Sequence, residues 1–438
     1  MRMRLVRFTE TLIFMSLYDE LSWRGFISQA THEELAGLLE KERFTLYCGF
    51  DPTADSLHIG SLLPIMGLAH FQRAGHTPIA LMGGATGMIG DPSGKTEERQ
   101  LVTLDVIKHN LVGIEIQFRH FLDFSGDNAA IIANNTDWLG NIRLVTFLRE
   151  FGKHFSVNTM MAKESVRARL EDRDHGISFT EFSYQLLQAY DFLHLHDEYG
   201  CRLQIGGSDQ WGNIVAGMDL TRRLREGVTT FGLTFPLVTK ADGSKFGKTE
   251  TGNVWLDAKK TSPYKFYQFW INQADADVGR YLRFFTFMSR DAIEALDHAT
   301  QESPHERAAQ KTLAEEVTRM VHGEDALQNA IAASQAMFGG DLKGLDEATL
   351  EDVFSEVPSS EHPRSELSAD RLLIDVLVEC GTFSSKGEAR RMIKSGGLYL
   401  NNERVEADDT KLTGDSLCTE RIAVVRKGKK HYHLLKFD

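Results

Sequence analysis

The 438-residue sequence predicts an α/β fold with a parallel sheet, followed by a helical segment and a small region of mixed helices and strands. Residues 44–50 and 78–82 have the apolar composition of buried strands, and residues 62–74 between them have a helical pattern. A strand, a helix and a strand within about 40 residues form a βαβ unit, which favours a parallel sheet. Residues 263–336 have helical spacing with few Gly or Pro, and the last 70 residues combine helical periodicity with short strands.

Local signals place the ends of these elements. Pro64 lies in the first turn of the first helix, where its missing N–H costs little, and Gly75 ends that helix. A second helix begins after Ser178, because Glu181 three residues later has the spacing of a capping box, and it ends at Gly200. Two further strands, over residues 201–205 and 231–238, are followed by a polar loop over residues 239–252.

The chain length predicts roughly two to three domains. Residues 341–368 are acidic, weakly patterned and contain two prolines, so we expect a linker there. The expected division is residues 1–235 for the sheet domain, 236–262 for a loop and linker, 263–340 for a helical domain, 341–368 for the linker and 369–438 for the last domain.

Composition limits the classes of protein to consider. The sequence has no run of about 20 apolar residues, so we expect no membrane span. Residues 1–15 contain charged residues and no small-residue cleavage site, which argues against a signal peptide. The four cysteines are far apart and lack metal-site spacing, which fits a reducing cytoplasm. The net charge is −13, but residues 364–438 hold 14 Lys and Arg against 12 Asp and Glu, a local charge of +2.

The segment over residues 47–61 lies between a strand and the start of a helix, where free N–H groups and the helix dipole favour a phosphate. Thr53 and His58 can donate hydrogen bonds to phosphate oxygens, and Gly60 lets a flat ring approach the backbone. The alternative for a single histidine of this kind is a structural role in a cap or core.

A second polar segment, Lys245-Phe246-Gly247-Lys248-Thr249, lies in the glycine-containing loop. Two lysines three residues apart in a loop can hold a polyphosphate and stabilise the charge that develops on a leaving group. The alternative is a pair of solvated surface lysines.

The glycines around residue 90 do not form a standard nucleotide motif. The sequence Gly94-Lys95-Thr96 ends like a P-loop, but Ile89 stands where the first glycine is needed. The spacing also fails the dinucleotide fingerprint. The remaining features are a glycine-rich turn after a strand and the charged residues Asp91, Lys95 and Arg99.

One helix face carries a polar stripe. Tyr184, Gln188 and Asp191 are spaced i, i+4 and i+7, and apolar neighbours suggest that much of this helix is buried. A solvated face is the alternative. A buried carboxylate at Asp191 needs a hydrogen-bond donor, and a phenolic hydroxyl is a suitable one.

Together, His58-Ile59-Gly60-Ser61 and the downstream segment Lys245–Thr249 resemble the two signatures of the class I aminoacyl-tRNA synthetases. Those families carry His-x-Gly-His and Lys-Met-Ser-Lys-Ser. This sequence departs from them at Ser61, at Phe246-Gly247 and at Thr249, but the form of the second segment is common in bacterial tyrosyl enzymes. The resemblance runs from about residue 17 to the C-terminus and implies a Rossmann-like doubly wound catalytic domain.

The resemblance also implies roles for individual residues. The phenol oxygen of tyrosine contacts Tyr47 and Asp191, while the ammonium group is held by Asp91, Tyr184 and Gln188, with Asp51 nearby. The residues implied for ATP and the adenylate are Cys48, Gly49, Asp51, Gly60, Ser61, Gly207, Asp209 and Gln210. Those implied for catalysis at the phosphates are Thr53, His58, Lys95, Arg99, Lys245, Lys248 and Thr249.

The implied reaction is attack of the tyrosine carboxylate on the α-phosphorus of ATP, followed by transfer of tyrosine to the 3′ end of tRNA. Mg²⁺ is expected to arrive with ATP, with no metal held by the protein alone. A homodimer formed through an insertion at about residues 135–175 is also implied. The alternatives are a tryptophan enzyme of the same class and an RNA-binding relative without catalysis.

The C-terminal segment resembles an S4-type RNA-binding module. Lys386, Arg390 and Lys394 are spaced i, i+4 and i+8 on one helix face, with Arg391 beside them. The alternative is an ordinary solvated face. The module implies contact with RNA but not which RNA.

Overall fold

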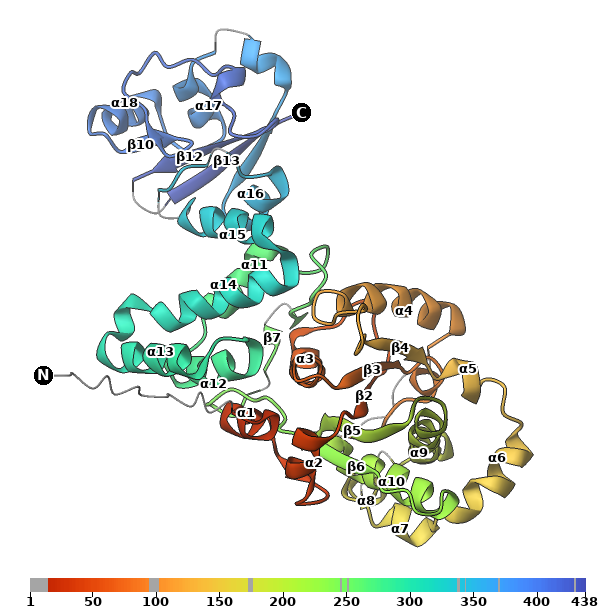
Figure 1. Ribbon diagram of the computed structural model, residues 1–438. Coiled ribbons are helices and arrows are strands. Elements are labelled where there is room, and N and C mark those ends of the chain that lie inside the picture. Colours follow the sequence, from red (N-terminus) through yellow and green to blue (C-terminus); the bar gives the residue numbers. More distant parts are fainter. Residues whose placement is uncertain are drawn as a thin grey trace, which may run out of the picture. The chain divides into compact units, whose positions relative to one another are not determined.

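The computed structural model describes residues 15–93, 102–171, 176–244, 246–249, 252–336, 339–342, 344–368, 371–428 and 431–438. Within these residues no helix is long and apolar enough to cross a membrane. The chain forms two compact units (Figure 1). The first comprises Met1–Leu256 and Ala276–His298, and the second Asp257–Asp275 and Ala299–Asp438.

A six-stranded sheet forms the centre of the first unit, in the order β1-β6-β5-β2-β3-β4. All neighbouring strands are parallel except the edge strand β1, which pairs antiparallel with β6. The strands are β1 (Gln29–Ala30), β2 (Thr45–Phe50), β3 (Thr77–Met82), β4 (Ile131–Asn134), β5 (Cys201–Gly207) and β6 (Phe231–Phe235). The predicted parallel α/β fold is therefore confirmed.

The strand order reverses between β2 and β5, because the chain builds outward from β2 to β4 and then returns to the other side of β2. Such a switch point leaves a crevice beyond the carboxyl ends of the two strands. Helices lie on both faces of the sheet (Figure 1). The helix α3 (Leu62–Arg73) packs against β2, β3 and β5, while α9 (Phe179–Tyr199) and α10 (Trp211–Leu224) pack against β5.

The helix α9 begins as the sequence predicts. The Ser178 side chain accepts a hydrogen bond from the Glu181 backbone, and Gly200 ends the helix in the left-handed conformation. The Glu181 side chain pairs with the guanidinium of Arg169 at 3.0 Å, and both side chains are buried. The start of α9 is thus tied to α8 (Glu164–Glu171).

The remaining helices of the first unit surround this core. They are α1 (Leu17–Arg24), α2 (Leu35–Lys41), α4 (Leu104–Phe118), α5 (Thr136–Leu139), α6 (Leu144–Glu150), α7 (Val157–Met161), α12 (Asp275–Phe285) and most of α13 (Arg290–Glu302). The buried guanidinium of Arg24 donates to the backbone oxygens of Arg283, Thr286 and Met288. These bonds hold α1 against the end of α12.

The second unit combines α11 (Pro263–Ile271), α14 (Ala308–His322), α15 (Glu324–Ala336) and a C-terminal five-stranded sheet in the order β11-β10-β12-β13-β9. The strands are β9 (Ser359–His362), β10 (Leu398–Leu400), β11 (Glu403–Arg404), β12 (Ile422–Lys427) and β13 (His431–Phe437). Two helices, α17 (Leu373–Glu379) and α18 (Lys386–Lys394), precede β10.

Alternation along β12 and β13 gives this sheet two apolar faces. Ala423 and Val425 pack in one core with α17 and α18, whereas Ile422 and Val424 pack in a second core with α15. Successive side chains of a strand point to opposite faces, so a helix layer is needed on each side. This explains why α15 belongs to the same compact unit as the C-terminal sheet.

The expectation of a linker over residues 341–368 is wrong. This segment contains α16 (Glu347–Val353) and the edge strand β9, and it buries Leu342, Leu350 and Phe354 against the sheet. Acidic residues lie between these apolar residues in the sequence, and the two prolines, Pro358 and Pro363, flank β9. Together they hide a helical pattern that only a neighbouring sheet completes.

Candidate functional site

A cavity of about 600 Å³ opens at the switch point, and residues from the ends of β2 and β5 line it. This is the place at which an open α/β sheet binds ligands. The cavity collects most of the residues singled out in the sequence: Tyr47, Cys48, Gly49, Asp51, Thr53, His58, Gly60, Ser61, Asp91, Tyr184, Gln188, Asp191, Gly207, Asp209 and Gln210.

Asp191 is almost completely buried at 1% exposure and has two hydrogen-bond donors. Trp138 Nε1 donates to one carboxylate oxygen at 2.7 Å, and Asn135 Nδ2 donates to the other at 3.0 Å. Burial raises the pKa of Asp191 to about 7, although these two hydrogen bonds oppose the shift. The predicted burial of this carboxylate is correct.

The donors that a buried Asp191 is expected to need are present within the chain itself, because Asn135 and Trp138 supply two. Asn135 follows β4 directly, and Trp138 lies in the short helix α5 that comes next. The rule that functional side chains follow strand ends could have identified them, but their contact with Asp191 depends on how α9 packs beside β4, more than 50 residues away in the sequence.

The Tyr47 hydroxyl lies in the same part of the cavity. It is fully buried and has no hydrogen-bond partner in the described part of the chain. Burial raises the pKa of Tyr47 well above its ordinary value, and the charge of Asp191 adds to this shift. An unpaired buried hydroxyl carries an unfavourable free energy that a polar ligand atom removes.

Carboxylates surround the neighbouring part of the cavity. Asp51 accepts from the Thr86 hydroxyl at 2.8 Å and from the Tyr184 hydroxyl at 2.9 Å. Asn135 Nδ2 also lies 3.0 Å from Thr86 Oγ1, so the hydrogen-bond network continues from Asp51 to Asp191. Thr86, like Asn135, was not singled out in the sequence.

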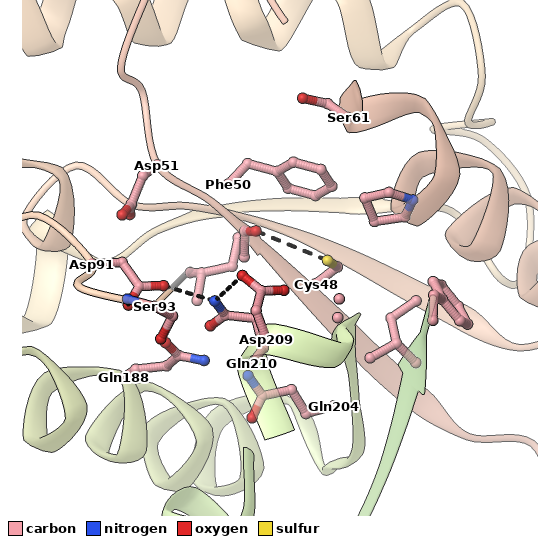
Figure 2. Close-up of a pocket in the computed structure, with 18 of the residues that line it drawn as sticks. Cys48, Phe50, Asp51, Ser61, Asp91, Ser93, Gln188, Gln204, Asp209 and Gln210 are labelled. Carbon is pink, nitrogen blue, oxygen red and sulfur yellow. Dashed lines mark hydrogen bonds between the residues drawn. The ribbon is translucent and has the colours of Figure 1, made fainter. Parts of the chain in front are cut away.

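Gln210 Nε2 donates to Asp91 at 2.7 Å and to Asp209 at 3.2 Å (Figure 2). Asn213 donates to the side-chain oxygens of Gln188 and Gln210 at 3.1 and 3.2 Å. Burial raises the pKa of Asp209. Several carboxylates around one small space favour a cationic group in the ligand.

The two signature segments lie side by side. The Ile59 backbone N–H donates to the Val254 oxygen at 3.0 Å, and His58 forms a bridge with Trp255. Val254 in turn donates to the Gly247 oxygen at 3.1 Å. His58 Nδ1 accepts from the Gly60 backbone at 3.0 Å, which leaves Nε2 as the ring's donor.

Two of the residues by which the second signature departs from the family form, Phe246 and Gly247, have structural roles. Phe246 is buried and its ring packs on Tyr281 and Phe285 of α12, with ring centres 4.9 and 5.4 Å apart. Gly247 has a φ of +82°, and a Cβ there would lie 2.9 Å from Ile59. The Phe246-Gly247 pair therefore anchors the loop beside the first signature.

The structure places only part of the predicted set of cations. Lys248 is exposed on β7 (Lys248–Thr249), which pairs with β8 (Gly252–Asn253). Thr249 is described by its backbone alone. The calls on Lys95, Arg99 and Lys245 fall outside the described residues.

The helix α18 exposes the predicted basic face. Lys386, Arg390 and Lys394 are all exposed, while Ala389 and Ile393 on the opposite face are buried. Two of the exposed cations have acidic partners, because Lys386 pairs with Asp375 at 2.9 Å and Arg390 with Asp408 at 3.0 Å. Arg391 is also exposed.

Two family models match the chain. The model "tRNA synthetases class I (W and Y)" matches residues 39–339. The model "Tyrosine--tRNA ligase SYY-like C-terminal domain" matches residues 349–435. The first match covers strands β2 to β6 of the sheet, the cavity and both signature segments.

Individual proteins give the same result. A tyrosine–tRNA ligase of Geobacillus kaustophilus (strain HTA426) is 56% identical over 425 residues, which cover 97% of this chain and all of the relative. A tyrosine–tRNA ligase of Roseiflexus castenholzii (strain DSM 13941 / HLO8) is 55% identical over 423 residues, 96% of this chain and 99% of the relative.

Among solved structures, a C-terminally truncated mitochondrial tyrosyl-tRNA synthetase of Aspergillus nidulans is similar, with a TM-score of 0.65 and 30% identity. The similarity covers 72% of this chain and 92% of that one. Because identity above 50% extends over nearly the whole chain and both family models agree, the chain belongs to the tyrosyl-tRNA synthetases of class I.

Proposed function

We propose that the cavity activates L-tyrosine with ATP, giving tyrosyl-adenylate and pyrophosphate, and that the tyrosyl group is then transferred to the 3′ end of a tRNA. The observation that carries this proposal is that two buried groups, the Tyr47 hydroxyl and the Asp191 carboxylate, lie near each other in the cavity. The Tyr47 hydroxyl has no partner in the described residues, and the Asp191 carboxylate lies close enough to raise its pKa. A phenolic hydroxyl can accept from the first and donate to the second.

Selection of tyrosine follows from this pair. Phenylalanine fits the same space but leaves the Tyr47 hydroxyl buried and unpaired. A site built to bond a substrate hydroxyl rejects the analogue that lacks it, and tyrosyl synthetase is the standard example of this behaviour. Because Asn135 and Trp138 already donate to Asp191, its carboxylate is held in place and keeps two hydrogen bonds when no substrate is bound.

The substrate ammonium group fits the carboxylate-lined part of the cavity. Asp91 and Asp51 provide negative charge, and Tyr184 and Gln188 provide oxygens. Tyr184 already donates to Asp51 at 2.9 Å, so its oxygen can accept from the ammonium group. This arrangement orients the tyrosine carboxylate toward the mouth of the cavity, where the ATP residues lie.

ATP then occupies the side of the cavity formed by residues 48–61 and 207–210. Thr53 and the Nε2 group of His58 donate to phosphate oxygens, and the backbone at Gly60 contacts the nucleotide. Lys248, with Lys95, Arg99 and Lys245, stabilises the pyrophosphate as it leaves. Catalysis by position and charge needs no covalent enzyme intermediate. Mg²⁺ enters as the complex with ATP.

The C-terminal sheet with α17 and α18 is proposed to act as an S4-type module that binds tRNA through Arg391, Lys394 and their neighbours. Positively charged side chains on an exposed helix face bind phosphates of RNA.

The four cysteines are free thiols, which fits a protein that works in a reducing cytoplasm.

A homodimer is proposed through the segment that contains α6 and α7. This segment exposes large apolar side chains, among them Leu144 at 71% and Val145 at 76% exposure. Clustered apolar exposure of this kind is typical of surfaces that bind another protein. Light scattering during size-exclusion chromatography is expected to give about twice the chain mass of 49.3 kDa.

Exchange of pyrophosphate into ATP tests the proposed function. Run with tyrosine, tryptophan or phenylalanine, the purified chain is expected to catalyse exchange with tyrosine alone at low amino-acid concentration. Exchange with tryptophan would assign it to the other specificity of the class. No exchange with any of the three would favour an RNA-binding role without catalysis.

A further inference from the structure

One face of the helix α4 packs against segment 52–57, the stretch of chain between β2 and the first signature. The contact includes Asn110, Gly113 and Gln117. These residues are spaced i, i+3 and i+7, so they share one face of the helix. Both polar side chains are buried, Asn110 at 5% and Gln117 at 7% exposure. The sequence did not single out any of the three.

The amide of Gln117 holds the end of segment 52–57. Its Oε1 accepts from the Leu57 backbone N–H at 2.8 Å, and its Nε2 donates to the Ser56 hydroxyl at 2.9 Å. That hydroxyl donates in turn to the Leu57 backbone oxygen at 2.8 Å. A buried backbone N–H outside regular helices and sheets needs another partner, and a side-chain amide is a common one. Gln117 therefore satisfies the backbone directly before His58.

The other two residues hold the segment nearer its start. Asn110 Nδ2 donates to the Pro52 backbone oxygen at 2.9 Å. At Gly113 the helix and the segment approach so closely that a Cβ would clash with the Asp55 backbone oxygen. Glycine is unfavourable in the interior of a helix, so this close contact is a physical reason for its presence. Thr53 thus lies between points of the backbone that α4 holds.

Leu57 also connects this segment with the chain that follows the second signature. Its backbone oxygen accepts from the Leu256 N–H at 2.9 Å. The peptide groups of Leu57 are therefore bonded to α4 on one side and to Leu256 on the other. Leu57 and His58 both line the cavity, so this doubly held backbone lies at the proposed site of ATP.

We propose that Gln117, with Asn110 and Gly113, positions the phosphate-binding donors of the cavity. These three are positioning residues, because they act through the backbone that carries Thr53 and His58. The inference rests on the proposed function, in which those two side chains donate to ATP. Catalysis by position is sensitive to small displacements, since a shift of about 1 Å can cost about a hundredfold in rate.

The variant Gln117→Met tests the proposal, because methionine has a similar length and makes neither hydrogen bond. In pyrophosphate exchange at saturating tyrosine, kcat/KM for ATP is expected to fall by at least about tenfold. The fall should appear mainly in kcat, since the donors stabilise charge that develops in the transition state. The dissociation constant of tyrosine without ATP, measured by equilibrium dialysis, is expected to change by less than about twofold, because α9 and β2 hold the tyrosine residues.

Gln72 of α3 gives a matched control. It is exposed by 8%, and its amide also bridges the backbone of a loop. It accepts from the Asp123 N–H at 2.9 Å and donates to the backbone oxygens of Asp123 and Asn128. Gln72→Met is expected to lower the free energy of unfolding in urea as Gln117→Met does, but to leave exchange unchanged. Equal kcat/KM in the two variants would overturn the proposal.

A double-mutant cycle with His58→Ala separates positioning from general damage to the fold. Because Gln117 is proposed to act through the backbone of His58, its replacement should matter less once the imidazole is gone. In the His58→Ala protein, Gln117→Met is expected to lower the remaining activity by at most about threefold. A further loss as large as the one in the wild type would mean that the two residues act independently, against the proposal.

Gly113→Ala keeps the test valid if Gln117→Met does not fold. Alanine favours a helix more than glycine does, so α4 itself is not weakened, but the added Cβ displaces the Asp55 backbone. The same fall in kcat/KM for ATP with unchanged binding of tyrosine is expected, and wild-type kinetics would refute the positioning role. A wild type without tyrosine-dependent exchange would instead contradict the proposed function, and this inference with it.

Discussion

At the scale of single residues, the cavity depends on groups that are held before any substrate arrives. Asp191 has both carboxylate oxygens bonded, whereas the Tyr47 hydroxyl next to it has no partner in the described residues. The Asp191 carboxylate is thus held in place, and the Tyr47 hydroxyl can form a hydrogen bond with a ligand atom. In the proposed function, this difference lets this part of the cavity recognise a phenolic hydroxyl.

The titration of Asp191 leads to a prediction for stability. Its folded pKa of about 7 lies above the ordinary value of 3.8, so the folded chain holds a proton that the unfolded chain releases between these values. The stability this proton contributes is complete below about pH 4 and is lost as the pH rises to 7, at most about 1.4 kcal/mol per pH unit. Urea unfolding at pH 5, 6 and 7 is expected to show the wild type losing stability relative to Asp191→Asn. An equal dependence of the free energy of unfolding on pH in the two proteins would contradict this prediction.

His58 and Ser61 lead to a second prediction at this scale. His58 Nδ1 accepts from the Gly60 backbone, which leaves Nε2 to donate to the proposed nucleotide, whereas the Ser61 side chain makes no capping bond to α3. His58→Ala is expected to lower kcat/KM for pyrophosphate exchange by about a hundredfold, as loss of one charge-stabilising donor does. Ser61→His is expected to change it far less. Losses of equal size in the two variants would show that position 61 shares the role.

At the scale of elements, α9 carries Tyr184, Gln188 and Asp191 into the cavity, and its first turn is held by the buried pair of Arg169 and Glu181. In a capping box the Glu181 side chain would accept from the Ser178 backbone N–H, but here it pairs with Arg169. Because neither side chain is exposed by more than 3%, each charge relies on the other.

Removing one member of this pair is therefore expected to be costly. Arg169→Met leaves Glu181 buried without its partner and should lower the free energy of unfolding by about 3–5 kcal/mol. The double variant Arg169→Met/Glu181→Leu removes both charges and should recover most of that loss. Urea unfolding of the wild type, the single variant and the double variant measures these free energies. A double variant as unstable as the single one would mean that shape rather than charge holds α9.

The sequence predicts the elements whose signals are local. β2, α3, β3 and the capped start of α9 all appear within a few residues of their expected bounds, because turn residues and apolar periodicity act over short distances. The contacts of Asp191 with Asn135 and Trp138 could not be predicted, since they depend on how α9 packs beside the distant strand β4. Residues 341–368 were misjudged for a similar reason: their apolar side chains are buried only by the sheet beyond them.

At the scale of the whole molecule, the two compact units carry different parts of the proposed function. The cavity and the described part of both signatures belong to the first unit, and α18 belongs to the second. Amino-acid activation and binding of tRNA can therefore be changed independently.

A charge reversal on α18 tests this separation. Arg391→Glu combined with Lys394→Glu is expected to lower kcat/KM for tRNA in aminoacylation by at least about tenfold, with a smaller dependence on salt, because phosphate contacts are lost. Pyrophosphate exchange without tRNA should be unchanged. The control Lys41→Glu reverses an exposed charge on α2 of the other unit. Equal effects of the control and the α18 variant would contradict an RNA-binding role for this face.

The central claim is that Asp191 and Tyr47 read the phenolic hydroxyl of the substrate, and one ratio tests it most directly. The measurement is kcat/KM for pyrophosphate exchange with tyrosine divided by that with phenylalanine, in the wild type and in Asp191→Ala. The claim predicts that the ratio falls in the variant by at least about tenfold, because a buried bond to the substrate hydroxyl is lost. An unchanged ratio, with both substrates slowed equally, would contradict it.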